Sequence, residues 1–323
     1  MDFQPKLSPE ISSSLLGIVG PTGIGKTEAA LSLTRQIPSE IVVVDSMQVY
    51  RGMDIGTGKP DRSVRDIIPH HGLDLVEPEE EFNVARYVEM VSPEISSMSA
   101  RGHLPVLVGG SGLYLRALID GLCPAPGEDP VLREKLLVES REKGAQQLHD
   151  RLKEVDPPAA AKIHPNNLRR LIRALEVFLT TGRPLSQWHR QTTSSLGSGR
   201  KILLVGLTCD RALLYRRIEQ RIDGWLEAGW LDEAKRLRAR SLSETAREAL
   251  GYRELFDFLD GRADWQTTCQ LMKRNTCRYA KRQLTWFRAD PRIHWIQTDE
   301  KSPEQITQEI RTLWNEPSLL PSN

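Results

Sequence analysis

The chain has 323 residues, of which 39% are hydrophobic and 27% are charged. These values exclude a wholly disordered protein and leave room for two domains with a sizeable core. Lys and Arg number 44 against 43 Asp and Glu, so the formal net charge is only +1. Any affinity for nucleic acid must therefore come from local basic patches.

Secretory and membrane classes are not indicated. The cysteines form no CxxC pair, which predicts free thiols in a reducing compartment and no zinc site. The apolar runs have the length of strands, far below the roughly 20 residues of a membrane span. The first residues, MDFQPKLSPEISSS, lack the basic start and apolar core of a signal peptide. We expect a cytoplasmic protein that has no membrane partner. The four cysteines are Cys123, Cys209, Cys269 and Cys277.

Short apolar runs that end at turn residues alternate with helical patterns. Continuous apolar runs predict buried parallel strands, and their alternation with helices predicts an α/β fold with an open, mostly parallel sheet. In such sheets the ligand lies at the carboxyl ends of the strands. The expected strands are residues 15–19, 41–44, 106–108 and 202–205, and the clearest helices between them are residues 27–36 and 114–119.

Two seams interrupt this alternation, a Pro- and Gly-rich stretch over 121–130 and a Ser- and Gly-rich one over 191–199. Nothing between them has the pattern of a strand. A leucine stripe over 168–179 predicts a helix that starts after Asn167 and stops at Gly182. We therefore expect a core of the P-loop NTPase type in two parts, 1–122 and 198–323. A helical domain over 123–197 would be inserted between them.

The stretch GPTGIGKT fits the phosphate-binding pattern GxxxxGK[ST] between a predicted strand and a predicted helix. Its glycines let backbone N–H groups surround phosphate oxygens, and the helix adds its positive end. Lys26 would add a charge, and the Thr27 hydroxyl is placed to ligate Mg²⁺. The loop alone does not say whose phosphates it binds. Its residues are Gly20, Pro21, Thr22, Gly23, Ile24, Gly25, Lys26 and Thr27.

Two polar residues follow other predicted strands. Asp45 directly follows the second strand, where a carboxylate can hold Mg²⁺ through water or take a proton from a nucleophile. The alternative is a cap of the following turn, and the position at a strand end favours the catalytic role. Ser111, in VGGSGLY, would face a ligand, or else it belongs to a tight strand-to-helix turn.

Two basic segments suggest RNA. Residues 273–288 contain six basic residues, no acidic one, and the aromatic residues Tyr279, Trp286 and Phe287. Such a mixture suits phosphate contact and base stacking, although an amphipathic helix with its aromatic side chains in the core is the alternative. Arg169, Arg170 and Arg173 form a second patch on the inserted helix, or a solvated face. The adjacent His70 and His71 are interpreted as structural.

Taken together, these motifs resemble the tRNA dimethylallyltransferase family, also called tRNA isopentenyltransferase, in its bacterial form without a C-terminal zinc finger. The similarity covers nearly the whole chain, in order. It runs through GPTGIGKT, DSMQVYRGMDIGTGKP, HHGLDLVEP, LVGGSGLYL, AAKIHPNNLRRLIRALEVFLTTGRP, GYRE and AKRQLTWFR.

The resemblance implies transfer of a dimethylallyl group from its diphosphate to N6 of the adenosine 3′-adjacent to the anticodon. The tRNAs would be those that read codons beginning with U, the diphosphate would leave with the help of Mg²⁺, and the enzyme would be a monomer. The catalytic residues would be Asp45, Lys26, Thr27, Ser111 and Arg221. The tRNA contacts would be Asp45, Ser46, Met47, Gln48, Ser111, Arg133, Arg169, Arg170, Leu171, Ile172, Arg173, Gly251, Tyr252, Arg253, Lys281, Arg282, Gln283, Trp286 and Arg288.

The chain departs from the family pattern at a few positions. Ser111 stands where the family usually has Thr, Asn167 where it has Asp, and Gly58 where it has Ala. Cys277-Arg278 replaces a usual Arg-Gln pair, which puts one basic contact in doubt. Three alternatives stay open: a P-loop kinase acting on a small molecule, an adenylate isopentenyltransferase with a free nucleotide acceptor, and an RNA-binding switch without prenyl chemistry.

Overall fold

The computed structural model describes residues 13–192, 196 and 199–315. The chain divides into two compact units, 1–119 with 196–323, and 120–195. The N-terminal stretch that was assessed for a signal peptide lies outside the described residues, apart from Ser13 and Ser14. So do much of the predicted Ser- and Gly-rich seam and the expected boundary at 197–198. Within the described ranges, no helix combines the length and the apolar composition needed to span a bilayer.

The first unit is built on a six-stranded, all-parallel sheet with strand order β3-β2-β4-β1-β5-β6. The predicted open parallel α/β fold is confirmed. Two edge strands were not expected from the sequence, β3, which has only two residues, and β6, whose sequence IHWIQ mixes polar and apolar residues. The strands are β1 (Ser14–Val19), β2 (Ser39–Val44), β3 (His70–His71), β4 (Leu104–Gly109), β5 (Lys201–Thr208) and β6 (Ile293–Gln297).

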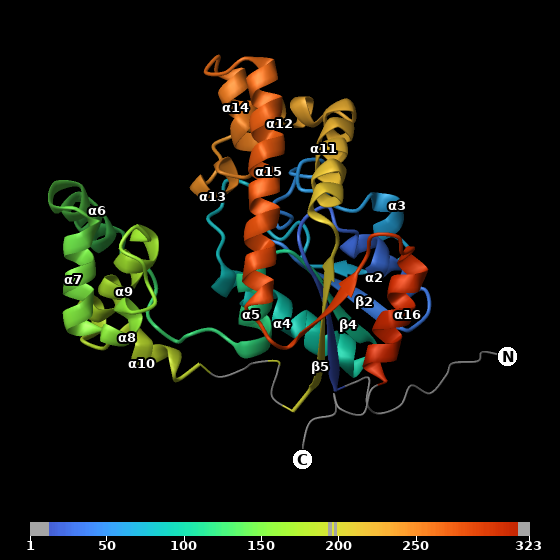
Figure 1. Cartoon of the computed structure of the whole chain (residues 1–323), viewed down its shortest axis with the longest axis horizontal. Helices are drawn as coiled ribbons and strands as arrows, with labels where there is room; N and C mark the ends of the chain where they lie inside the picture. The colour runs from blue at the N-terminus through green and yellow to red at the C-terminus, as the bar shows by residue number, and fades with distance from the viewer. Residues whose placement is uncertain (1–12, 193–195, 197–198, 316–323) are drawn as a thin grey trace. The chain divides into compact units, whose positions relative to one another are not determined.

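The central strands are buried along their whole length. Every residue of β1 and β4 is buried, as expected of parallel strands covered by helices. Helices α2 and α16 pack against each other, and α4 packs on β2 and β4 (Figure 1). The helices next to the sheet are α2 (Lys26–Thr34), α3 (Arg62–Arg65), α4 (Val84–Ala100), α5 (Gly112–Asp120) and α16 (Pro303–Trp314).

The register of the sheet brings three strand ends level. Val19 of β1 and Val44 of β2 both pair with Gly109 of β4. The residues that follow each strand therefore meet at one edge. These are the phosphate loop, Asp45 and the Gly110–Ser111 turn.

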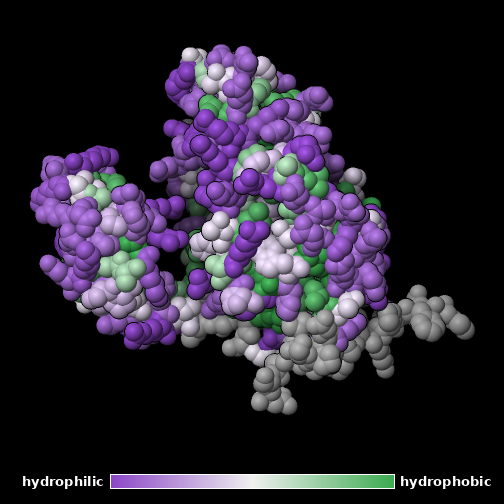
Figure 2. All heavy atoms as spheres, viewed as in Figure 1, coloured by the Kyte–Doolittle hydropathy of each residue, from purple (hydrophilic) through white to green (hydrophobic). Residues whose placement is uncertain are grey.

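Helices α11 to α14 stand beyond the carboxyl ends of the strands, and α15 runs from this tier back alongside the sheet (Figure 1). Helix α15 begins at the cap Asp264, whose side chain accepts a hydrogen bond from the Thr267 N–H at 2.8 Å. Figure 2 shows mainly hydrophilic residues over this tier. Its helices are α11 (Arg211–Glu227), α12 (Trp230–Arg238), α13 (Glu244–Arg247), α14 (Tyr252–Leu259) and α15 (Trp265–Arg288).

The second unit contains helices and, among its described residues, no strand, and it has its own apolar core. Its leucine-striped helix α9 is capped by Asn167, whose side chain accepts from the Arg170 N–H at 3.4 Å, and it ends at Gly182. The sequence predicted both ends of this helix. The helices are α6 (Pro130–Lys143), α7 (Ala145–Val155), α8 (Pro157–Ala160), α9 (Leu168–Thr181) and α10 (Leu185–His189), and the core includes Leu136, Leu148, Leu152, Leu171 and Leu175.

One buried carboxylate ties the amino end of β2 to its neighbours. Glu40 is only 3% exposed and contacts His71 at 2.7 Å, His103 at 2.6 Å and Arg101 at 2.7 Å. Burial alone would raise the pKa of Glu40. The hydrogen bonds from Arg101, His103 and His71 outweigh burial and lower that pKa to about 2.

Glu40→Gln should therefore lower the free energy of unfolding by about 1–3 kcal/mol at pH 7, because it weakens a buried, fully bonded group. Since the folded-state pKa of Glu40 lies below its ordinary value, its contribution is complete above pH 4.5 and is lost as the pH falls toward 2. The difference in the free energy of unfolding between wild type and variant should therefore shrink as the pH falls from 4.5 toward 2. Urea unfolding at several pH values, with the exposed Glu89→Gln as control, measures it. A gap that does not change between pH 7 and pH 3 would contradict this account of Glu40.

Candidate active site

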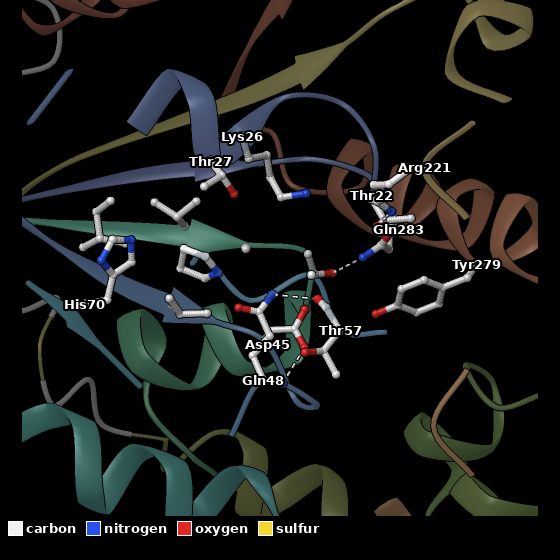
Figure 3. Close-up of a pocket in the computed structure, with 17 residues that line it drawn as sticks. Thr22, Lys26, Thr27, Asp45, Gln48, Thr57, His70, Arg221, Tyr279 and Gln283 are labelled. Carbon is white, nitrogen blue, oxygen red and sulfur yellow. Dashed lines mark hydrogen bonds between the residues drawn. The ribbon is translucent and has the colours of Figure 1, made fainter. Parts of the chain in front are cut away.

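A cavity lies where the three strand ends meet (Figure 3). One end is polar, with Thr22, Lys26 and Thr27 of the phosphate loop facing Arg221. The other end is largely apolar, lined by Ile41 and Val43 of β2, Val108 of β4 and Pro60. The remaining lining residues are Asp45, Gln48, Thr57, Gly58, His70, Gly109, Gly110, Tyr279 and Gln283. The cavity can therefore hold a compact ligand that has an anionic end and a short apolar end.

The phosphate loop is closed by its own lysine. The Lys26 Nζ donates to the Pro21 carbonyl at 2.8 Å. Burial, and to a lesser extent the nearby Arg221, lower the pKa of Lys26 to about 8 against the opposing effects of Asp45 and Glu28. A bound anion would favour the charged ammonium and offer it a better acceptor than the carbonyl.

Arg221 comes from α11, almost two hundred residues away in sequence, and reaches the same loop. Its Nη2 donates to the Thr22 hydroxyl, and its Nε is buried without a hydrogen-bond partner among the described residues. Burial lowers the pKa of Arg221 to about 10, so the guanidinium stays charged at neutral pH. A buried cation with an unused donor is an anion-binding group that has spare capacity.

Asp45 lies directly after β2 and its carboxylate faces the space between Lys26 and Tyr279 (Figure 3). Its Oδ1 accepts from the N–H groups of Met47 at 2.8 Å and Gln48 at 3.3 Å. Asp45 is therefore a turn cap and a cavity residue at once, so the two alternatives from the sequence are not exclusive. Burial raises the pKa of Asp45 above its ordinary value, against the two backbone N–H groups and the charges of Lys26 and Arg221.

Ser111 supports this turn. Its hydroxyl accepts from the Ser46 N–H at 3.2 Å, and its own N–H donates to the Val44 carbonyl at 3.3 Å. Ser111 is not among the residues that line the cavity. Its observed contact positions the residue next to Asp45.

Gln283 connects α15 to both glycine-containing turns. Its Oε1 accepts from the Thr22 N–H at 2.9 Å, and its Nε2 donates to the Gly110 carbonyl at 3.0 Å. A Cβ at Gly110 would lie 2.1 Å from that Nε2, so only glycine allows this approach. The side chain predicted to contact tRNA is instead buried and occupied by the phosphate loop, because it lies on the inner face of α15.

Two other lining residues gained no catalytic interpretation from the sequence. Burial raises the pKa of Tyr279 to about 12, so its hydroxyl keeps its proton near Asp45. His70 lies at the apolar end with its Nδ1 2.6 Å from the Ile68 carbonyl, and its Nε2 is buried without a partner among the described residues. His70 thus lines the cavity, which the sequence did not predict, because the register of β3 against β2 places it beside Ile41.

The outward face of α15 carries a cationic stripe. Arg274, Arg278, Lys281, Arg282 and Arg288 are all exposed, and none of them forms an ion pair with another described residue. The successive intervals are four, three, one and six residues, and at about 100° per residue all five fall on one side of the helix. We call these five residues the α15 stripe.

The Cys277-Arg278 departure leaves the α15 stripe intact. Cys277 is 8% exposed and points inward, whereas Arg278 lies on the exposed face. Trp286 stays 38% exposed at the edge of the stripe, next to Gly112, while Phe287 is buried. Phe287 therefore belongs to the core, which was the alternative to an RNA contact, whereas Trp286 is only partly covered.

Several of the expected RNA contacts on the second unit are occupied or buried. Arg133 and Arg173 both bind Glu176, at 2.9 and 2.7 Å, and Arg173 also donates to two backbone carbonyls. Leu171 and Ile172 are buried, because they lie on the inner face of α9. Arg169 and Arg170 remain exposed, without a partner among the described residues.

The segment Gly251–Arg253 is likewise structural in its observed contacts. Tyr252 is fully buried, and its hydroxyl binds Glu233. Glu233 also accepts from the N–H groups of Asp54, Ile55 and Gly56 at 3.0–3.3 Å. Arg253 pairs with Glu254 at 2.9 Å. These contacts fix the loop that leads into Thr57 and Gly58 of the cavity.

The cavity contains oxygen ligands of the kind that Mg²⁺ prefers. The Thr27 hydroxyl forms no hydrogen bond with another described residue, and Asp45 supplies a carboxylate in the same cavity. Among the described residues no group of three or more acidic, His or Cys side chains could hold a metal alone. Mg²⁺ is commonly held by one or two protein oxygens together with substrate phosphates and water, and the residues fit that arrangement.

Comparison with known proteins identifies a family that the chain resembles. The chain matches the family model described as IPP transferase over residues 48–290 and the one described as isopentenyl transferase over residues 13–67. It is 45% identical to a tRNA dimethylallyltransferase of Carboxydothermus hydrogenoformans, with 94% of this chain and 97% of the relative covered. A tRNA dimethylallyltransferase of Halothermothrix orenii is 43% identical, with coverage of 94% and 93%.

Solved structures agree. A full-length tRNA isopentenylpyrophosphate transferase of Bacillus halodurans is 40% identical, with a TM-score of 0.69 and coverage of 94% of this chain and 95% of that one. A eukaryotic dimethylallyltransferase acting on tRNA gives a TM-score of 0.79 at 26% identity, with coverage of 94% and 80%. The resemblance found in the sequence motifs is confirmed, and the chain belongs to the IPP transferase family.

Proposed function

We propose that the protein transfers the dimethylallyl group of dimethylallyl diphosphate to N6 of the adenosine 3′-adjacent to the anticodon, in tRNAs that read codons beginning with U. The observation that carries the proposal is the two-ended cavity. The cations Lys26 and Arg221 line one end, where an anion would bind, and aliphatic side chains offer a short apolar wall at the other. A nucleoside triphosphate bound by the same loop would have no use for that wall.

The cationic end stabilises the leaving group. As the C–O bond to the prenyl carbon breaks, the electron pair goes to the departing diphosphate. Lys26, Arg221 and the N–H groups of the phosphate loop face the charge that develops there. Mg²⁺, held by Thr27 and the diphosphate itself, supplies further charge neutralisation when bound.

Asp45 acts on the other reactant. An adenine amine is a poor nucleophile because its lone pair is delocalised into the ring. Asp45 accepts a hydrogen bond from N6 and takes its proton as the C–N bond forms. The backbone N–H groups of Met47 and Gln48 hold the carboxylate in place. Ser111 fixes the same turn through Ser46, a positioning role in place of the direct contact that the resemblance implied.

The RNA would approach over the α15 stripe, with Trp286 at its edge and with Arg169 and Arg170 of the second unit as further phosphate contacts. The target base must leave the anticodon-loop stack to enter the cavity, and unstacking costs less in a loop than in a duplex. We propose that the enzyme acts as a monomer in the cytoplasm, where tRNA is available.

The decisive assay is mass spectrometry of an anticodon stem-loop after incubation with the protein, Mg²⁺ and dimethylallyl diphosphate. We expect one five-carbon unit on the adenosine that follows the anticodon. Modification of free adenine nucleotides alone would favour the adenylate isopentenyltransferase. Transfer of the γ-phosphoryl group from ATP to a small molecule, without prenyl transfer, would favour the kinase.

In that assay Asp45→Asn should lower the rate of transfer by about 10²–10⁴-fold, because the amide cannot accept the N6 proton. The amide oxygen can still cap Met47 and Gln48, so the donor affinity should change little. Single-turnover rates and donor calorimetry separate the two effects. A rate within a few-fold of wild type would remove Asp45 as the base.

Donor binding should depend on pH through Lys26. The pKa of Lys26 is about 8 in the free protein, and the bound diphosphate favours the ammonium, so binding takes up a proton above pH 8. The apparent Kd should rise about tenfold between pH 7 and pH 9. Calorimetry of the donor measures this, and Lys26→Met should bind weakly with no such rise. The same rise in the variant would assign the titration to another group.

The α15 stripe should bind RNA through charge alone. Arg278→Ala should weaken stem-loop binding a few-fold and reduce the slope of log K against log salt by about 0.7–0.9. Lys301, which is already paired with Glu309, provides the matched control Lys301→Ala. Fluorescence anisotropy at several salt concentrations measures both. An unchanged slope in Arg278→Ala would exclude this residue from the interface.

A further inference from the structure

The guanidinium of Arg221 is held in an unusual way. A buried arginine is normally oriented by a carboxylate, yet no described acidic residue forms a salt bridge with it. Among the described residues, Thr22 is its one hydrogen-bond partner, and its Nε has none. Some other contact must fix the plane of the guanidinium at the cavity.

That contact is Trp225, one helical turn further along α11. The Arg221 Cζ lies 4.5 Å from the centre of the Trp225 ring, within cation–π range. Stacking fixes the plane of a guanidinium and leaves its N–H groups free to bind other partners. The indole therefore orients Arg221 without occupying the donors that a diphosphate needs.

Trp225 is itself held from two sides. Its ring meets Trp230 edge to face, with centroids 5.4 Å apart, and Trp230 is 2% exposed and packs in turn on Tyr252. On the other side, a Cβ at Gly58 would lie 2.9 Å from the Trp225 ring. Gly58 also has a φ of +67°, which L side chains rarely adopt, so position 58 leaves space for the indole.

We propose that Trp225 is a positioning residue for the diphosphate site, which holds the Arg221 guanidinium against the phosphate loop before the ligand arrives. The inference rests on the proposed function in that Arg221 faces the diphosphate of the prenyl donor. Pre-organisation of this kind increases ligand affinity, because a mobile arginine side chain would first have to be ordered on binding.

The test is binding of inorganic diphosphate with Mg²⁺, measured by calorimetry on the full chain. This probe needs neither a prenyl group nor RNA, so a failure of prenyl transfer would not decide it. Trp225→Leu should weaken binding about fivefold to tenfold, and Trp225→Phe should recover most of the loss. Trp265→Leu, which removes a half-exposed tryptophan that packs on Phe258, should leave the affinity unchanged.

A double-mutant cycle separates positioning from a general structural role. In an Arg221→Ala background, Trp225→Leu should cause no further loss of affinity, because its effect passes through the missing arginine. In the transfer assay, Trp225→Leu should raise KM for the donor and leave KM for the stem-loop unchanged. Losses that add in the double variant, or an equal rise of both KM values, would overturn the proposal.

Discussion

The arrangement of the site depends on three charged groups that are desolvated in one cavity. Lys26, Arg221 and Asp45 are each only partly exposed, and desolvation disfavours the charged form of each one. Two cations face one carboxylate in the cavity, and Glu28, which acts on both cations from outside it, forms no salt bridge with either among the described residues. Desolvation of these charges destabilises the free protein, and a bound anionic ligand would offset that destabilisation. The phosphate loop, the strand ends and α11 together place the charges where such a ligand would bind.

The surrounding contacts hold this arrangement without saturating it. Gln283 fixes the phosphate loop through Thr22, and Glu233 fixes the Asp54–Gly56 turn through backbone N–H groups. In both cases a neutral or distant group provides rigidity, so the charged residues of the cavity keep unused bonding capacity. Active sites depend on such support from outside, because a misplaced reactive group loses most of its effect.

The sequence was sufficient to predict the fold class, the phosphate loop and Asp45, because these features are local. Continuous apolar runs mark buried parallel strands, and the residue after such a strand points to the ligand edge. The stripe of Leu171 and Leu175 with its Asn167 and Gly182 ends defined α9 for the same reason. Each of these depends on a few neighbouring residues.

The rest depended on contacts between distant segments. The basic segment that became α15 gave no sign that Gln283 faces inward while Lys281 and Arg282 face outward, since helical phase is fixed by packing. His70 entered the cavity through the register of β3 against β2. Nothing in the arginine pattern distinguished Arg173, which binds Glu176, from Arg169, which has no ion-pair partner in the described part of the chain.

The two faces of helix α15 differ in role. Gln283 on the inner face contacts the phosphate loop, and the α15 stripe lies on the exposed outer face. One inserted or deleted residue between Tyr279 and Arg288 would rotate everything beyond it by about 100°. Such a change would pull Gln283 from the phosphate loop, or turn the charges beyond it toward the core, or both. The outer face of this segment should therefore tolerate substitutions better than the segment tolerates a change in length.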